Sequence, residues 1–142
     1  MRVLRNTVHL PADRFTELWQ PASFEAWLET ASALKRLQGV LMRVGPQDGT
    51  ADGLRAFCAI CPHEICHVEV ARETSDLPMD TGPPPAHPVF VCPCHFSIFD
   101  PLEDGRAISG PALRGLYRFE FQLVDGTVEI DRVEADVEAI FS

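Results

Sequence analysis

Two short segments of the chain each combine cysteine and histidine at close spacing. The first places Cys61 and His63 in a C-x-H arrangement, and the second places Cys92 and His95 in a C-x-x-H arrangement. Each segment therefore supplies one thiolate and one imidazole from a single loop. Each also carries one further cysteine nearby. Two sulfur and two nitrogen ligands, delivered in pairs by two loops, form a donor set suited to a metal centre.

The pattern C-x-H … C-x-x-H resembles the Rieske family, whose [2Fe–2S] cluster has two cysteines on one iron and two histidines on the other. The resemblance implies that Cys61, His63, Cys92 and His95 are the cluster ligands. Neutral imidazoles add no negative charge, so the histidine-ligated iron is easier to reduce. The reduction potential of such centres lies at roughly −150 to +300 mV, against about −400 mV for plant-type ferredoxins. The expected function is one-electron transfer.

The residues around these ligands extend the resemblance. Residues 61–66 and 92–100 are similar to the two cluster loops of high-potential Rieske proteins, in which the two non-ligand cysteines form a disulfide between the loops. Cys66 and Cys94 match those positions. The resemblance covers roughly residues 39 to 131.

Three further positions are candidates for tuning the cluster. Residues 109–112 resemble the proline loop that covers the cluster in the family, with Pro111 as its proline. Ser97 matches a serine that donates a hydrogen bond to the cluster. Phe99 stands where subunits of cytochrome bc complexes usually carry a tyrosine with a similar role. Such hydrogen bonds stabilise the reduced, more negative cluster, so Phe99 implies a potential below the top of the Rieske range.

Two other departures from the family pattern concern the loops. The family usually has glycine after the second histidine, where this chain has Phe96. The stretch between the loops, residues 64–91, is also longer than usual.

A structural zinc site is the main alternative. Cys58 and Cys61 form a C-x-x-C pair, and Cys92 and Cys94 could complete an all-cysteine tetrahedron. That arrangement leaves both histidines without a role, and it needs a C-x-C half that is less typical of zinc ribbons. Cys58 lies in an apolar run, where a buried and inert thiol is the simpler expectation.

The length of 142 residues predicts one Rieske domain over residues 1–142. We expect a mostly β fold, a small antiparallel barrel or sandwich with the cluster-binding loops 61–67 and 92–99 at one tip. The Asp125-Gly126 dipeptide between two alternating segments predicts a hairpin. The strands predicted from alternation and turn residues cover residues 3–10, 40–44, 54–60, 67–71, 89–91, 116–124 and 128–130.

An N-terminal strand and helix are expected to occupy residues 1–38, before the Rieske core at 39–131. Ser23 is a candidate cap for a helix from Phe24 to Leu37. Its apolar positions predict one stripe, packed either on the core or on a larger subunit, with Trp19 and Trp27 as anchors. The apolar positions of this stripe are Phe24, Trp27, Leu28, Ala31 and Leu34. The tail from Val133 to Phe141 also has helical spacing.

The proline-rich stretch at residues 72–88 predicts a stiff insertion between the cluster loops, because proline fixes φ and lacks a backbone donor. The turn-rich residues 45–49 predict a connection between strands. The insertion is interpreted either as a surface loop or as part of a partner-docking surface.

Composition limits the function classes. The net charge of −9 argues against nucleic acid as a partner, because phosphate binding needs a basic face. It is compatible with a basic redox partner. No stretch approaches the ~18 consecutive apolar residues of a membrane span, so we expect the chain to have no span of its own.

Three functions compete at this stage. The favoured one is an electron-transfer subunit of a respiratory or photosynthetic complex, with redox proteins or larger subunits as partners and quinol oxidation as a candidate reaction. The second is the small Rieske subunit of a molybdenum oxidoreductase such as arsenite oxidase, where Phe99 has parallels. The third is a soluble Rieske ferredoxin for an oxygenase, a class that lacks the extra cysteine pair. In each case the chain is an electron-transfer component rather than a stand-alone enzyme.

The cysteine pair also bears on the compartment. Disulfides persist in oxidising compartments. This predicts a location on the periplasmic side, peripheral to a membrane complex, with a soluble cytoplasmic protein as the alternative.

Overall fold

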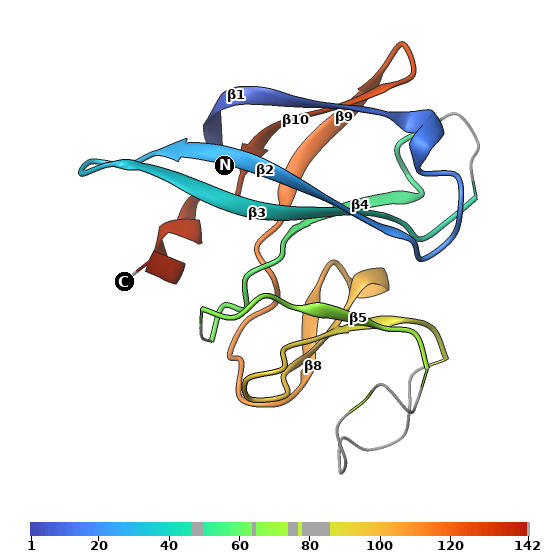
Figure 1. Cartoon of the computed structure of the whole chain (residues 1–142), viewed down its shortest axis with the longest axis vertical. Helices are drawn as coiled ribbons and strands as arrows, with labels where there is room; N and C mark the ends of the chain where they lie inside the picture. The colour runs from blue at the N-terminus through green and yellow to red at the C-terminus, as the bar shows by residue number, and fades with distance from the viewer. Residues whose placement is uncertain (47–49, 64, 74–76, 78–85, 142) are drawn as a thin grey trace.

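The computed structural model describes residues 1–46, 50–63, 65–73, 77 and 86–141. In these residues the strands form three antiparallel sheets, with the orders β1-β10-β9, β2-β3-β4 and β5-β6-β7-β8 (Figure 1). The strands are β1 (Arg2–Pro11), β2 (Pro21–Glu29), β3 (Leu34–Arg43), β4 (Leu54–Cys58), β5 (Glu69–Ala71), β6 (Val89–Val91), β7 (Ile98–Asp100), β8 (Arg106–Ser109), β9 (Phe119–Val124) and β10 (Thr127–Val133). The short 3₁₀ helices are η1 (Ala12–Arg14), η3 (Pro101–Glu103) and η4 (Ala135–Phe141).

The predicted mostly β fold is confirmed. The expected hairpin is formed by β9 and β10, and its two turn residues, Asp125 and Gly126, have φ angles of 48° and 78°. Two consecutive positive φ values are typical of a type I′ turn, whose twist matches that of the flanking strands. The helical tail is present as η4.

The predicted helix from Phe24 to Leu37 is wrong. These residues form the hairpin of β2 and β3, in which Glu29 is paired with Leu34. The turn between them is closed by Thr30, whose N–H and hydroxyl both donate to the Ala33 carbonyl, at 2.9 and 2.7 Å. On β2 the buried residues alternate with exposed ones, as a strand with one buried face requires.

The apolar stripe assigned to that helix is therefore divided between the two faces of a sheet. Phe24 and Leu28 are buried, whereas Trp27 and Leu34 are 38% and 46% exposed. The helical docking face does not exist. Trp19, its other proposed anchor, lies before β2, where its ring stacks on His87 at a centroid distance of 5.4 Å.

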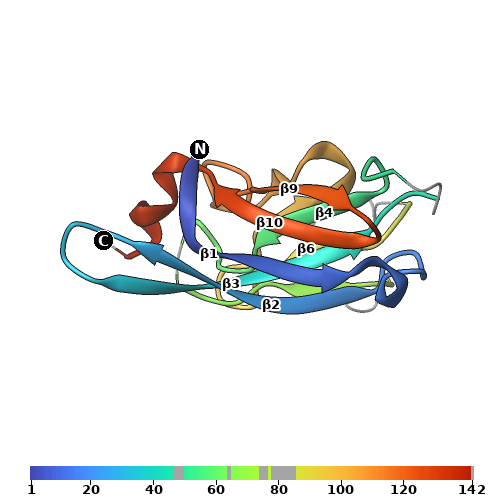
Figure 2. The same cartoon turned by 90° about the horizontal axis from the view of Figure 1, so that it is seen from above.

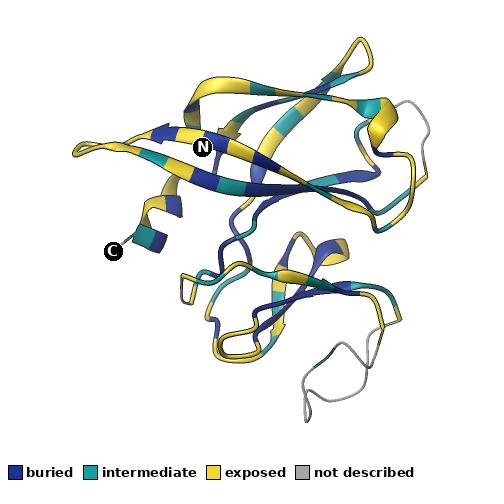
Figure 3. Ribbon diagram, in the orientation of Figure 1, coloured by how far each residue is buried: buried dark blue, intermediate teal, exposed yellow. Residues whose placement is uncertain are grey.

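Two apolar cores hold the sheets together. The larger one lies between the sheets β1-β10-β9 and β2-β3-β4, which are stacked one above the other in Figure 1 and overlap when the molecule is seen from above (Figure 2). The smaller one joins β3 and β4 to the sheet of β5 to β8, drawn below them in Figure 1. All residues of β6 and β7 are buried, as the dark blue stretches of the lower sheet show in Figure 3. Phe90 and Phe99 belong to this core, whereas Val89, Val91 and Ile98 form a third cluster with Ala71. The smaller core comprises Val40, Met42, Phe57, Cys61, Phe90, Cys92, Phe99, Ala112 and Leu116.

Two predictions fall largely outside the described residues. They are the turn at 45–49, of which 47–49 are not described, and the insertion at 72–88, of which 74–76 and 78–85 are not described. Among the described residues, no helix has the length and apolar character needed to cross a membrane.

Candidate metal centre

The first cluster loop continues the line of β4. Beyond Cys58, the Ala59 N–H donates to the Gln38 carbonyl at 2.8 Å, and Ile60 forms a β-bridge with His67. The loop closes where the Cys61 N–H donates to the Cys66 carbonyl at 2.8 Å. This geometry places Cys61 at the base of the loop, buried in the smaller core. His63 lies further out and is exposed.

The second cluster loop joins β6 to β7 and has the same layout. The Cys92 N–H donates to the Ser97 carbonyl, and the Phe96 N–H donates to the Cys92 carbonyl, both at 2.9 Å. Cys92 is buried at the base, and His95 is exposed near the outer end. Phe96 closes this loop in the left-handed backbone conformation, with a φ of 66°. That conformation explains why glycine is usual at this position.

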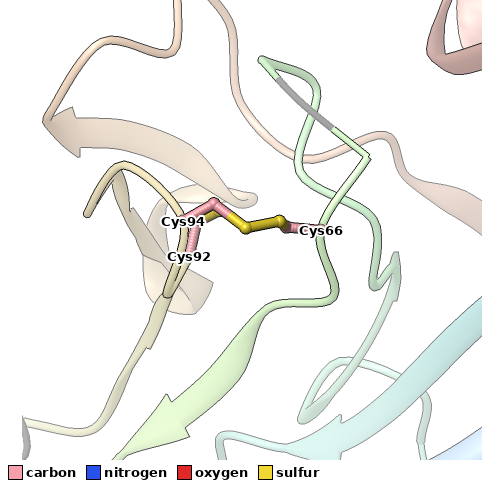
Figure 4. Close-up of side chains that lie close together, drawn as sticks. All are labelled: Cys66, Cys92 and Cys94. Atoms are coloured by element: carbon pink, nitrogen blue, oxygen red, sulfur yellow. A yellow bond between two sulfur atoms is a disulfide. The ribbon is translucent and has the colours of Figure 1, made fainter.

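The two loops meet as the sequence resemblance implied. Cys66 and Cys94 form a disulfide with a Cα–Cα distance of 6.4 Å (Figure 4). The rings of His63 and His95 lie edge to face, with centroids 5.2 Å apart. The sulfur of Cys92 lies within 4.8 Å of both sulfurs of the disulfide. Both predicted halves of the site are therefore in one place.

This arrangement argues against the zinc alternative. An all-cysteine site needs Cys94 as a ligand, but its sulfur is bonded to Cys66. Cys58 belongs to the larger core and Cys61 to the smaller one. Burial raises the pKa of the Cys58 thiol to about 11, against a smaller lowering by a backbone hydrogen bond with Ile60. A thiolate ligand is disfavoured there.

The donor set fits a Rieske cluster. Cys61 and Cys92 keep their thiols outside the disulfide, and both are buried at the loop bases. The two imidazoles are exposed and adjacent. A two-iron group with thiolates on its inner iron and imidazoles on its outer iron matches this division of buried sulfur and exposed nitrogen.

A third loop, residues 110–114, packs against the second. Gly110 has a φ of 89°, and a Cβ at this position would lie 2.8 Å from the Ser97 nitrogen, so only glycine allows the approach. Two residues on, the Ala112 N–H donates to Ser97 Oγ at 3.0 Å. Ser97 is fully buried. Because its oxygen accepts this bond, its hydroxyl proton is left to donate elsewhere.

The other two candidate tuning residues differ in burial. Pro111 is exposed on the third loop. Phe99 is fully buried on β7, where it is paired with Phe90 on β6. Phe99 shares the smaller core with Cys61 and Cys92, which is the location expected for a side chain that contacts the cluster region.

Sequence reasoning missed an ion-pair network behind the third loop. The Glu134 carboxylate accepts hydrogen bonds from Arg114 Nη2 and, at 2.8 Å, from Arg118 Nε. The Arg114 guanidinium also lies over the Tyr117 ring, 3.8 Å from its centroid. The hydrogen bond to Glu134 is the main cause that raises the pKa of Arg118 above its usual value. No spacing rule could have found this network, because Glu134 is distant in sequence from both cluster loops.

Comparison with known families identifies the class of protein. The sequence model of the Rieske [2Fe–2S] domain matches residues 26–120. The chain therefore belongs to the Rieske [2Fe–2S] family. Its cofactor is a [2Fe–2S] cluster, and its activity is electron transfer.

A solved structure with a TM-score above 0.5 supports the same fold. The chain is similar to the ferredoxin of carbazole 1,9a-dioxygenase from Nocardioides aromaticivorans IC177, at 14% identity and a TM-score of 0.53, covering 88% of this chain and 96% of that one. It is also similar to the plasma membrane Rieske protein PetC3 from the cyanobacterium Synechocystis PCC 6803, at 22% identity and a TM-score of 0.44, covering 78% and 86%. No curated protein sequence matches the chain.

Proposed function

We propose that Cys61 and Cys92 bind one iron of the cluster and that His63 and His95 bind the other. The carrying observation is the junction of the two loops, where a disulfide fixes the loops and the two imidazoles lie adjacent. Cys66 and Cys94 act as the clamp. Ser97, Phe99 and Pro111 set the surroundings of the cluster.

The chain's role is that of a high-potential one-electron carrier within a respiratory or photosynthetic complex. The bound cluster supplies a site that accepts and releases one electron. Buried Cys61 and Cys92 hold its inner side away from water. The exposed imidazoles of His63 and His95 face the exterior, where their outer ring nitrogens can accept a hydrogen bond from a quinol hydroxyl. Electron and proton can then leave the donor together.

A second function is the small Rieske subunit of a molybdenum oxidoreductase similar to arsenite oxidase. Phe99 favours it, because the aromatic ring is fully buried on β7 and has no hydroxyl to donate. In either role the clamp of Cys66 and Cys94 favours an oxidising compartment. We place the protein on the periplasmic side, bound to redox partners at the face that carries His63 and His95.

A redox titration of the purified holoprotein between pH 6 and 10, followed by EPR, tests the proposal. The expected result is a reduced Rieske signal with a positive potential that falls as the pH rises. A negative, pH-independent potential would contradict the high-potential role and support a ferredoxin. His95→Cys should keep a two-iron signal but lower the potential, because it adds thiolate charge. The matched variant His67→Cys, at a histidine outside the ligand set, should leave the potential unchanged.

A further inference from the structure

The third loop is anchored at two points that differ in kind. At its start, Gly110 packs directly on the Ser97 backbone, and the Ala112 N–H donates to Ser97 Oγ. At its end, Arg114 is bound to Glu134, at the junction of β10 and η4. The residue between the anchors, Leu113, is fully exposed and contributes little to holding the loop. The position of Ala112 therefore depends on both anchors.

The anchor at Glu134 is largely shielded from solvent. The Glu134 side chain is only 16% exposed, so its ion pairs are less screened by water than those at the surface. Arg114 is held by three contacts at once: its Nη2 donates to Glu134, its Nε donates to the Gly115 carbonyl at 2.9 Å, and its guanidinium covers the Tyr117 ring. Tyr117 is itself buried. The anchor is thus fixed to the body of the protein.

We propose that Glu134 is a positioning residue for the redox centre, holding the third loop through Arg114 so that the Ala112 N–H fixes the orientation of the Ser97 hydroxyl. The inference rests on the proposed function, in which Ser97 belongs to the surroundings of the cluster, and on the hydrogen bond to the cluster that the family resemblance implies for its hydroxyl. With its lone pair engaged by Ala112, the Ser97 hydroxyl has fewer directions in which to donate. A loosened third loop removes that constraint and weakens a bond that favours the reduced state.

Because Glu134 is charged, the direction in which Glu134→Gln shifts the reduction potential tests the proposal. A carboxylate disfavours the reduced and more negative cluster through space. If Glu134 acted only through its charge, Glu134→Gln would raise the potential. If it acts by positioning, the same variant lowers the potential, because the reduced state loses its hydrogen bond.

The experiment is an EPR-monitored redox titration of the holoprotein and three variants. Glu134→Gln and Arg114→Lys should each lower the ratio of reduced to oxidised protein at a fixed potential by about threefold to tenfold. The upper value is a downward shift of about 59 mV for one electron. Arg118→Lys is the matched control, since Arg118 also binds Glu134 but lies outside the third loop. It should leave the potential unchanged. Arg114→Lys keeps the charge and serves alone if Glu134→Gln does not fold.

Two outcomes overturn the proposal. One is an unchanged or raised potential in both Glu134→Gln and Arg114→Lys, and the other is an equal decrease in Arg118→Lys. Combination with Ser97→Ala provides a second test, because Glu134→Gln should cause no further decrease once the hydroxyl is absent. A wild-type protein without a Rieske EPR signal would instead refute the proposed function. A normal wild-type signal with unresponsive variants refutes only the role of Glu134.

Discussion

At the scale of single residues, Phe96 shows how this chain departs from its family without changing the loop. The left-handed conformation costs a residue with a Cβ roughly 1–2 kcal/mol, yet Phe96 adopts it at a φ of 66°. Its ring is 51% exposed, so burial recovers only part of that cost. The strain lies beside His95, at the exposed end of the second loop.

Replacing this residue should stabilise the protein. Phe96→Gly removes a left-handed strain of roughly 1–2 kcal/mol but loses roughly 0.4–1 kcal/mol to unfolded-state entropy as well as the partial burial of the ring. The net gain should be at most about 1 kcal/mol. Urea unfolding of the holoprotein measures the change. Leu113→Gly is the matched control, because Leu113 is also an exposed apolar loop residue but lacks a positive φ. It should destabilise by roughly 0.4–1 kcal/mol, and a similar loss in Phe96→Gly would contradict the account.

Because the Cys58 thiol is buried, we expect the free energy of unfolding to fall at alkaline pH. Its pKa is raised from 9.0 to about 11 in the folded protein by burial. Above pH 9 the unfolded chain releases this proton while the folded chain retains it, so folding becomes less favourable as the pH rises. The loss should be about 1.4 kcal/mol per pH unit between pH 9 and 11.

The comparison of wild type with Cys58→Ala isolates this effect. Both proteins are unfolded in urea at pH 8, 9, 10 and 11, and the difference between their free energies of unfolding is plotted against pH. The variant pays a constant cost for its cavity, but it should lack the alkaline decrease due to Cys58. Parallel curves over the whole range would show that Cys58 is not protected from ionisation in the folded state.

At the scale of elements, the sequence predicted the strands around the site better than those before it. The Asp125-Gly126 dipeptide correctly predicted the β9–β10 hairpin, because both residue types readily adopt the positive φ angles that a two-residue hairpin turn needs. By contrast, residues 24–37 satisfied a helical spacing by coincidence, since Trp27 and Leu34 are exposed on strands. The competing signal was the alternation of Phe24, Ala26 and Leu28 with three residues that are exposed in the structure, namely Glu25, Trp27 and Glu29.

One glycine shows why only the tertiary structure resolves that ambiguity. Gly39 on β3 is paired with Phe24 on β2, and a Cβ at Gly39 would overlap the Phe24 ring. The ring lies over the glycine and packs edge to face on Phe119, with centroids 5.0 Å apart. This cross-strand packing needs a partner from β9, which no local pattern reveals. Local spacing was enough to predict the four proposed ligands. The contacts of Ser97 and Glu134 join residues that are distant in sequence, so local spacing could not predict them.

The disulfide between the cluster loops should contribute strongly to stability. It joins residues 28 apart in sequence, and chain entropy alone predicts roughly 3–4 kcal/mol for a closed loop of this size. Cys66→Ser should lower the free energy of unfolding by about that amount while leaving the cluster assembled. Thermal unfolding and the visible spectrum of the holoprotein measure the two effects.

The double variant Cys66→Ser/Cys94→Ser serves as the control. It should be no less stable than Cys66→Ser, because the bond is already lost in the single variant and the double variant has no remaining thiol at this junction. An unchanged melting curve in Cys66→Ser would show that the loops are held by their other contacts, such as those of the third loop with Ser97.

At the scale of the whole molecule, charge and shape have separate roles in meeting a redox partner. The net charge of −9 acts over long distances and should steer a basic partner toward the protein. The loops around the two histidines instead carry exposed apolar residues, namely Ile65, Phe96 and Leu113. Apolar contacts have short range, so they should affect the lifetime of the complex more than its rate of formation.

Electron transfer to a basic c-type cytochrome distinguishes these two roles. Raising the ionic strength from 0.01 M to 0.15 M shortens the Debye length from about 30 to about 8 Å. The second-order rate constant should therefore fall by roughly tenfold or more, as measured by stopped-flow spectroscopy. An acidic acceptor of similar potential should show the opposite trend. Leu113→Ala should leave the salt dependence unchanged and shorten the complex lifetime. A salt-independent rate with the basic cytochrome would mean that the surface near the histidines does not share the protein's net negative field.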